Sequence, residues 1–181
     1  FDAFELARKC GSDNINTDLI AGLPTDTPES FKNSLDSIVR LNAECITVHT
    51  LCMKRASRLT TEGVTLDLQQ ARDAREMLAY TQNILGQNEY IPYYMYRQSR
   101  MVGNLENVGW SKKGFESLYN VYVMDETHTI LACGSGGVTK LKRNNPDYLE
   151  RIFNFKYPYE YIDRFDELIQ RKSGIMQFYG Q

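Results

Sequence analysis

The chain has 181 residues and is almost neutral, because 21 Lys and Arg residues oppose 23 Asp and Glu residues and leave a net charge of −2. This balance excludes a global attraction to nucleic acid or anionic lipid, and no run of 18 apolar residues is present to span a membrane. The length predicts one domain, or one domain with a tail, and the lack of a secretory signal pattern predicts a soluble, cytoplasmic protein.

The first predicted elements are a helix, a buried strand and a second helix. Apolar residues spaced along the first ten positions indicate an amphipathic helix that ends at Gly11. Ile15–Ala21 is a short apolar run that stops at a Gly-Leu-Pro turn, which is typical of a strand buried on both faces. Pro28–Leu41 predicts a helix with Pro in its first turn. Because the first helix starts within its pattern and has no initial Met, we expect a piece of a longer protein.

The strand and helix pattern then repeats. Glu44–Leu51 is β-branched and apolar, and it predicts a second interior strand. Asp67 is a candidate N-cap for a long helix, Leu68–Leu85, and Tyr90–Tyr96 predicts a third strand. Strand and helix thus alternate at the spacing of βα units, which predicts parallel strands joined by right-handed crossovers.

After Arg97 the pattern changes to short segments separated by glycines. Val121–Met124 and Thr129–Cys133 predict the two strands of a hairpin. Arg151–Phe155 predicts a short strand, and Tyr159–Lys172 predicts a helix.

Several polar residues lie at or near the ends of the predicted parallel strands, where ligands bind in such sheets. Asp18, within the first strand, either reaches a bound small molecule or has a structural role, as a loop cap or the partner of a buried base. Lys54 and Arg55 follow the second strand and Arg97 follows the third. Each of these cations either binds carboxylates or is an ordinary loop residue in solvent. His49 lies within an apolar strand and is interpreted as a hydrogen-bonded core residue.

Neither the cysteines nor the glycine-rich turn carries a recognised cofactor motif. Cys10, Cys45, Cys52 and Cys133 contain no closely spaced pair, so we assign no metal ligand and expect reduced, mostly buried thiols. Ala132–Lys140 is neither a Walker A loop nor a dinucleotide-binding loop, and its glycines indicate only that the backbone can approach a ligand closely.

Taken in order, several segments resemble the oxygen-independent coproporphyrinogen III oxidases of the HemN type, which are radical S-adenosylmethionine (SAM) enzymes. The first of these segments are DLIAGLP from Asp18, PESF from Pro28, ITVHTL from Ile46 and KRAS from Lys54. The later ones are most similar to the HemZ branch of the family: YRQ from Tyr96, GNLENVG from Gly103, YN from Tyr119 and GSG from Gly134. The resemblance covers nearly the whole chain.

The resemblance implies an α/β fold, the C-terminal portion of a partial (β/α)6 barrel with parallel strands, followed by a short α+β tail. Residues 1–100 would form the second part of the barrel, 101–146 a Gly-rich hairpin with the final barrel segment, and 147–181 the tail. In this family a [4Fe–4S] cluster binds and cleaves SAM. The resulting radical removes a hydrogen from a propionate of coproporphyrinogen III, and loss of CO₂ leaves the vinyl groups of protoporphyrinogen IX.

The resemblance also implies roles for particular residues. Asp18 matches a carboxylate that contacts SAM, and Cys52 and Val138 match positions whose backbone contacts SAM. The substrate carries several carboxylates, and three rim cations are candidates for binding them: Lys54, Arg55 and Arg97. No residue is assigned a catalytic role.

The chain departs from the family pattern at the cluster loop, because the CxxxCxxC motif and the first strands are absent. We therefore expect an inactive C-terminal fragment that retains neither cluster nor SAM and whose partner is the missing N-terminal half. Strand Asn16–Ala21, without its upstream neighbour, is expected to pair with another copy or be covered by a rearranged segment. The alternative functions are a haem-binding chaperone of the same family and a nucleotide-binding module without chemistry.

Overall fold

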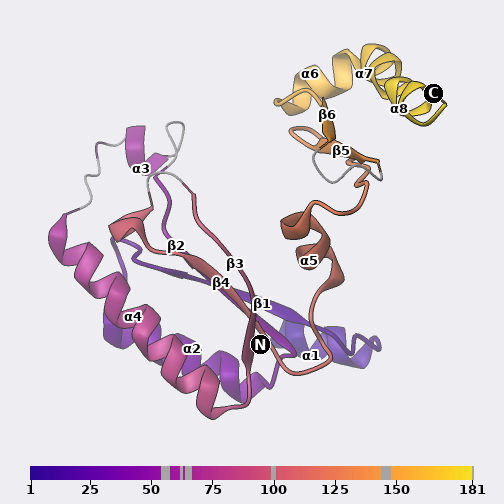
Figure 1. The fold of residues 1–181 in the computed structure, drawn as a ribbon. Coiled ribbons are helices and arrows are strands. Elements are labelled where there is room, and N and C mark those ends of the chain that lie inside the picture. Colours follow the sequence, from indigo (N-terminus) through magenta and orange to yellow (C-terminus); the bar gives the residue numbers. More distant parts are fainter. Residues whose placement is uncertain (54–57, 62, 64–66, 99–100, 144–147, 181) are drawn as a thin grey trace. The chain divides into compact units, whose positions relative to one another are not determined.

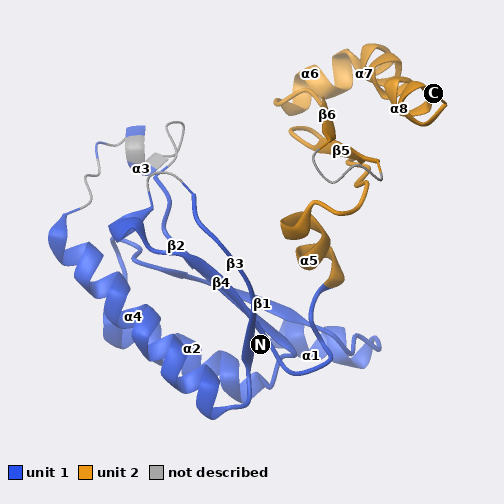
Figure 2. Ribbon diagram, in the orientation of Figure 1, with its two compact units in different colours: residues 1–117 blue, residues 118–181 orange. Residues whose placement is uncertain are grey.

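The computed structural model divides the chain into two compact units, Phe1–Ser117 and Leu118–Gln181 (Figure 2). It describes residues 1–53, 58–61, 63, 67–98, 101–143 and 148–180. No helix in these described ranges is long and apolar enough to cross a lipid bilayer.

The first unit alternates strands and helices through its first three strands (Figure 1). Its elements are α1 (Asp2–Lys9), β1 (Asn16–Ala21), α2 (Pro28–Leu41), β2 (Cys45–Thr50), α3 (Arg58–Thr61), α4 (Leu68–Gln87), β3 (Ile91–Tyr96), the 3₁₀ turn η1 (Val102–Asn104) and β4 (Asn107–Ser111). The strands and helices predicted before residue 97 are confirmed, with bounds that differ by two residues at most.

The sheet of the first unit is mixed rather than wholly parallel. Its order is β1-β2-β4-β3, with β1 parallel to β2 and with β4 antiparallel to both of its neighbours. The predicted strands β1, β2 and β3 therefore run in the same direction, but β3 does not pair with β2. The sequence analysis missed β4 because Gly109 interrupts a short segment that is otherwise only partly apolar.

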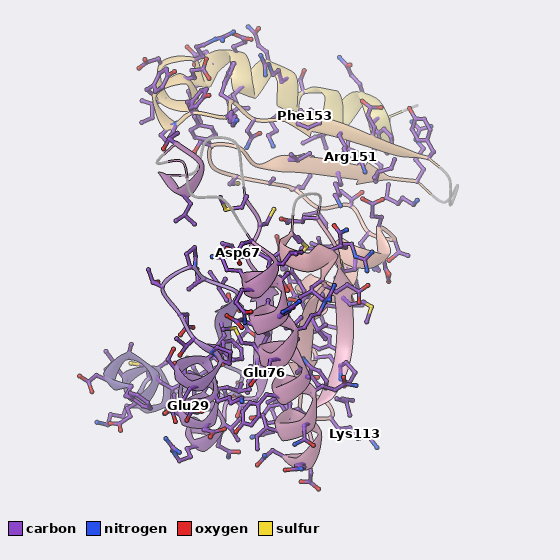
Figure 3. All side chains as sticks on the ribbon, turned by 90° about the vertical axis from the view of Figure 1, so that its left-hand side faces the viewer. Glu29, Asp67, Glu76, Lys113, Arg151 and Phe153 are labelled. Atoms are coloured by element: carbon purple, nitrogen blue, oxygen red, sulfur yellow. The ribbon has the colours of Figure 1, made fainter. Side chains whose placement is uncertain are left out.

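Side-chain caps fix where the two long helices begin. At the start of α2, the Thr27 side chain accepts a hydrogen bond from the Ser30 N–H, and the Ser30 hydroxyl accepts one from the Thr27 N–H. At the start of α4, Asp67 and Gln70 form the same reciprocal pair, and Figure 3 shows Asp67 at this end of the helix. The predicted N-cap at Asp67 is therefore confirmed. Such capping boxes pair backbone N–H groups that the first turn of a helix leaves without a partner.

The main core lies between the sheet and the two long helices, which cover one face of it (Figure 1). Fully buried members come from α2, α4, β2 and the end of β1: Phe31, Leu35, Met77, Leu85, Ile46, Val48 and Ala21. On the outer side of the helices, Lys32 donates to Glu76 over 2.7 Å. The apolar stripes of both helices thus meet the side chains that point to one face of β2.

In the second unit the predicted hairpin is wrong. Val121–Met124 lies inside helix α5 (Leu118–Asp125), and Thr129–Cys133 contributes only the isolated bridge from Ile130 to Lys140. The alternation of Val and Tyr in this segment imitates a strand pattern, but Thr129–Cys133 forms no strand to pair with it. The hairpin that forms joins β5 (Val138–Lys142) to β6 (Leu149–Phe153), so the predicted short strand is found about two residues earlier.

The rest of this unit consists of three short helices, α6 (Pro158–Asp163), α7 (Phe165–Lys172) and α8 (Gly174–Tyr179). The predicted helix is therefore interrupted at Arg164. Arg151 and Phe153 mark β6 in Figure 3, and Arg151 lies 3.0 Å from Glu126, which also pairs with Lys140 at 2.7 Å. The predicted division into a barrel part (1–100), a Gly-rich segment (101–146) and a tail (147–181) stays a prediction.

Candidate functional site

The sheet of the first unit has a second face, turned away from α2 and α4, and its middle is polar. Side chains alternate along a strand, so Leu19 and Val48 enter the core while Asp18 and His49 point to the other side. The strand pairing puts Gly109 of β4 beside Thr47, and Tyr94 and Tyr96 of β3 on the same face of the sheet. We call the following set the polar face: Asn16, Asp18, Thr47, His49, Tyr94 and Tyr96.

Asp18 is anchored through one of its two carboxylate oxygens. The Asn16 amide donates to Oδ1 over 2.7 Å, and His49 Nε2 lies 3.8 Å from the same oxygen. Within the described residues Oδ2 has no hydrogen-bond partner, and the side chain is 59% exposed. One oxygen therefore fixes the carboxylate while the other is available to accept from a ligand.

His49 joins Asp18 to Tyr96. Its Nδ1 lies 3.3 Å from the Tyr96 hydroxyl, and its side chain is 30% exposed. The prediction of a hydrogen-bonded histidine is confirmed, but its place in the core is wrong, because Ile46 and Val48 supply the buried face of β2. The alternation along this strand could have placed His49 on the face opposite Ile46 and Val48.

Two tyrosines form the aromatic part of the polar face. The rings of Tyr94 and Tyr96 are stacked, with centroids 6.3 Å apart and an interplanar angle of 5°. The Tyr94 hydroxyl lies 3.4 Å from the Thr47 hydroxyl, which donates to Asn16 Oδ1 over 3.1 Å. Burial raises the pKa of Tyr94 above 10, so its hydroxyl is neutral at physiological pH. The sequence analysis named neither ring.

Arg97 does not join Asp18 on the polar face. Its guanidinium pairs with Glu106 over 2.7 Å and is 56% exposed. Both residues line a hollow of about 370 Å³ with Leu78 and Gln82 of α4, on the side of the sheet that carries the helices. The structure therefore separates the predicted propionate cation from the predicted SAM carboxylate by the thickness of the sheet.

The other predicted site residues lie in three different settings. Cys52 follows β2 and bridges to Met101, at the end of the sheet where β1 and β2 finish. Val138 is the first residue of β5 and belongs to the second unit. Lys54 and Arg55 lie outside the described residues.

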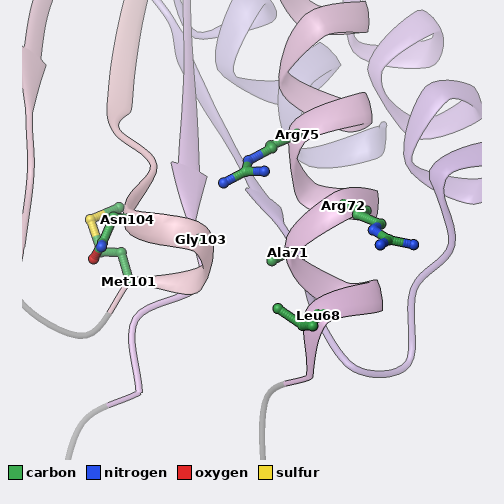
Figure 4. A pocket seen from close by; sticks show the side chains of 7 residues that line it. All are labelled: Leu68, Ala71, Arg72, Arg75, Met101, Gly103 and Asn104. Atoms are coloured by element: carbon green, nitrogen blue, oxygen red, sulfur yellow. The ribbon is translucent and has the colours of Figure 1, made fainter.

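A further hollow, of about 510 Å³, lies between the first half of α4 and η1 (Figure 4). Arg75 extends from α4 toward the turn that contains Gly103, whereas Arg72 extends to the other side. Within the described ranges neither arginine forms an ion pair. The sequence analysis did not single out these cations, because their spacing along α4 looks like that of any solvated helix face.

The described residues offer no metal site. No group of three or more His, Cys, Asp or Glu side chains among them could hold an ion. Burial raises the pKa of Cys45 to about 11, so this thiol stays protonated at neutral pH.

Comparison with known proteins relates the chain to coproporphyrinogen III oxidases and their relatives, although no family model matches it. It is 36% identical over 97% of its length to the oxygen-independent coproporphyrinogen-III oxidase-like protein HemZ of Bacillus subtilis. It is 29% identical over 80% of its length to the haem chaperone HemW of Lactococcus lactis. The chain covers 35% and 36% of these two proteins.

Among solved structures, the chain is similar to coproporphyrinogen III oxidase (HemN) from Escherichia coli, which is described as a radical SAM enzyme. The TM-score is 0.60 at 18% sequence identity, and the match covers 92% of this chain and 37% of that one. This match confirms the expected fold, an α/β portion of the HemN structure. The predicted resemblance to HemZ and HemN proteins is confirmed, over about a third of the length of these relatives.

Proposed function

We propose that the chain forms part of the SAM-binding barrel of a radical SAM protein that converts coproporphyrinogen III to protoporphyrinogen IX in the cytoplasm. The observation that carries the proposal is the Asp18 carboxylate, held by Oδ1 on the polar face with Oδ2 available. In a barrel of βα units the face opposite the helices is the inner one, and ligands bind at the rim formed by the carboxyl ends of the strands. The likeness to HemZ over almost the whole chain supports the same conclusion.

The residues present fit SAM. Asp18 Oδ2 is an acceptor suited to a ribose hydroxyl. Asp18 lies on β1, next to β2, and Cys52, whose backbone is the second proposed contact, follows β2. When bound, SAM supplies the radical chemistry of the reaction. The residues described here would bind and orient it and exclude water around the ribose; Val138 is proposed as a third contact, through its backbone.

The iron–sulfur cluster has no ligand set among the described residues. We propose that the cluster ligands belong to the N-terminal half of the same protein, as the two-thirds of the relatives beyond this match would allow. The isolated chain would then neither hold the cluster nor act on substrate.

For the substrate, we propose that Lys54, Arg55 and Arg97 bind propionate carboxylates. Arg97 already pairs with Glu106, so a propionate would have to share or replace this partner. A guanidinium has five N–H donors, and the contact to Glu106 uses one nitrogen, which leaves donors for a second carboxylate. Arg75 is an additional cation near the same end of the sheet.

The test uses the polypeptide encoded by the complete gene, purified without oxygen. We expect stoichiometric iron and sulfide, SAM-dependent loss of two CO₂ per coproporphyrinogen III, and a severe loss of activity in D18N. Haem binding without decarboxylation would overturn the proposal in favour of the chaperone function carried by the relative HemW. Binding of SAM or another nucleotide without either activity would favour a module that has lost its chemistry. Cluster formation and SAM cleavage by the 181-residue chain alone would disprove its proposed inactivity.

A further inference from the structure

The contacts on the polar face form one connected chain of polar groups. It runs from Asn16 to Asp18, from Asp18 to His49, and from His49 to Tyr96. The residues come from three strands: Asn16 and Asp18 from β1, His49 from β2 and Tyr96 from β3. Such a chain is a feature of the folded sheet rather than of any local segment.

We propose that His49 and Tyr96 are positioning residues that hold the Asp18 carboxylate in the orientation in which it binds its ligand. The inference rests on the proposed function, because Asp18 is the proposed SAM contact. It adds that the affinity of Asp18 for the ribose hydroxyls depends on two side chains that do not touch the ligand. Neither side chain belongs to the segment DLIAGLP that begins at Asp18.

The hydrogen-bond directions define the tautomer that this role requires. A tyrosine hydroxyl can donate to an unprotonated ring nitrogen or accept from a protonated one, and the proposed role requires Tyr96 to donate to His49 Nδ1. The proton of neutral His49 then lies on Nε2, which faces Asp18 Oδ1. With the other tautomer, a lone pair would face the carboxylate, and the contact would be repulsive.

Packing on either side restricts the positions that this chain can take. Tyr96 is stacked on Tyr94, and Tyr94 reaches back through Thr47 to Asn16, which donates to Asp18 Oδ1. Two routes therefore converge on the same carboxylate oxygen. Because both contacts use Oδ1, they leave Oδ2 in a defined direction instead of competing with the ligand for it.

A purely structural role for His49 does not account for its surroundings. The core beneath β2 is filled by Ile46 and Val48, and the His49 side chain is 30% exposed on the opposite face. Removing its ring should therefore leave the hydrophobic core intact. The expected effect of the substitution lies in ligand binding rather than in folding.

The first test is the SAM affinity of the complete protein, measured by calorimetry in a double-mutant cycle. We expect H49F to weaken binding about tenfold and D18N to weaken it more, with the D18N/H49F double variant no weaker than D18N alone. H49Q retains an N–H donor and should bind within about threefold of the wild type. H128F, at the second of the two histidines, is the matched control and should bind normally.

The second test is ¹⁵N NMR of the two imidazoles in the 181-residue chain. We expect His49 in the Nε2–H tautomer, and a shift toward mixed tautomers in Y96F while the His128 signals do not move. If D18N does not weaken SAM binding, the proposed function fails at this site. If D18N weakens binding but H49F does not, or if their effects add, or if His49 carries its proton on Nδ1, the positioning role alone is wrong.

Discussion

The tyrosine stack on the polar face can be displaced by a single methyl group. A Cβ built on Gly109 would lie 1.8 Å from Tyr94 Cε1, 2.4 Å from Cδ1 and 2.7 Å from Cζ. Gly109 does not have a positive φ, so Ala fits the backbone conformation there. The G109A substitution therefore acts on the protein only by pushing the Tyr94 ring away from the sheet.

The cost of G109A follows from what Tyr94 loses. Its stacking on Tyr96 and its hydrogen bond to Thr47 contribute roughly 1 kcal/mol each, and a ring forced off its rotamer costs roughly another 1 kcal/mol. Replacing Gly by Ala in a strand returns about 0.5–1 kcal/mol through lower unfolded-state entropy. We expect a net loss of about 2 kcal/mol in the free energy of unfolding of the first unit.

Urea unfolding followed by tryptophan fluorescence measures this loss directly. Trp110 is the single tryptophan of the chain and lies in the core of the first unit, so its emission reports on that unit. In a Y94A background the clash is absent, and we expect G109A to be neutral or stabilising by up to about 1 kcal/mol. An equal cost of G109A in both backgrounds, or a cost below about 0.5 kcal/mol in the wild type, would refute the packing described for Tyr94.

Three further predictions concern the core, a helix cap and acid stability. F31A should destabilise the first unit by about 3–5 kcal/mol in the same urea assay, whereas F115A at a part-exposed site should cost far less. D67A should cost about 1 kcal/mol by removing the α4 cap, and an unchanged midpoint would contradict the capping box. Burial raises the pKa of Glu44, but hydrogen bonds from a backbone N–H and from Arg8 outweigh it and bring the pKa below 4.5. The Glu44 carboxylate therefore stabilises the folded state above pH 4.5, and this stabilisation is lost as the pH falls through the lowered pKa of the folded state. In E44Q the urea midpoint should accordingly fall less steeply with acid than in the wild type.

Local signals in the sequence predicted the elements that depend on local interactions. The bounds of α2 and the start of α4 follow from Thr27, Pro28 and Asp67, which act within one turn of the helix. β4 could not be found this way, because the glycine within it, Gly109, makes room for the Tyr94 ring of β3, a contact between distant parts of the sequence. The α5 segment has a strand-like composition and becomes a helix in the absence of a pairing partner.

The candidate site was predicted in part for the same reason. Asp18 stands out in its own strand, but its contact with His49 depends on the pairing of β1 with β2. The contact of His49 with Tyr96 spans β4, a strand absent from the predicted topology. The sequence therefore identified the carboxylate and missed the side chains that orient it.

The shift of register between Pro92 and Tyr94 decides which side of the sheet receives each residue at the end of β3. In an uninterrupted ladder Tyr94 and Tyr96 would turn toward α4, and Arg97 would move to the side of Asp18. A single inserted residue thus places two tyrosine rings on the polar face, where Arg97 would otherwise lie. Relatives that differ by one position in this strand should accordingly differ in which charges they present to the molecule that they bind.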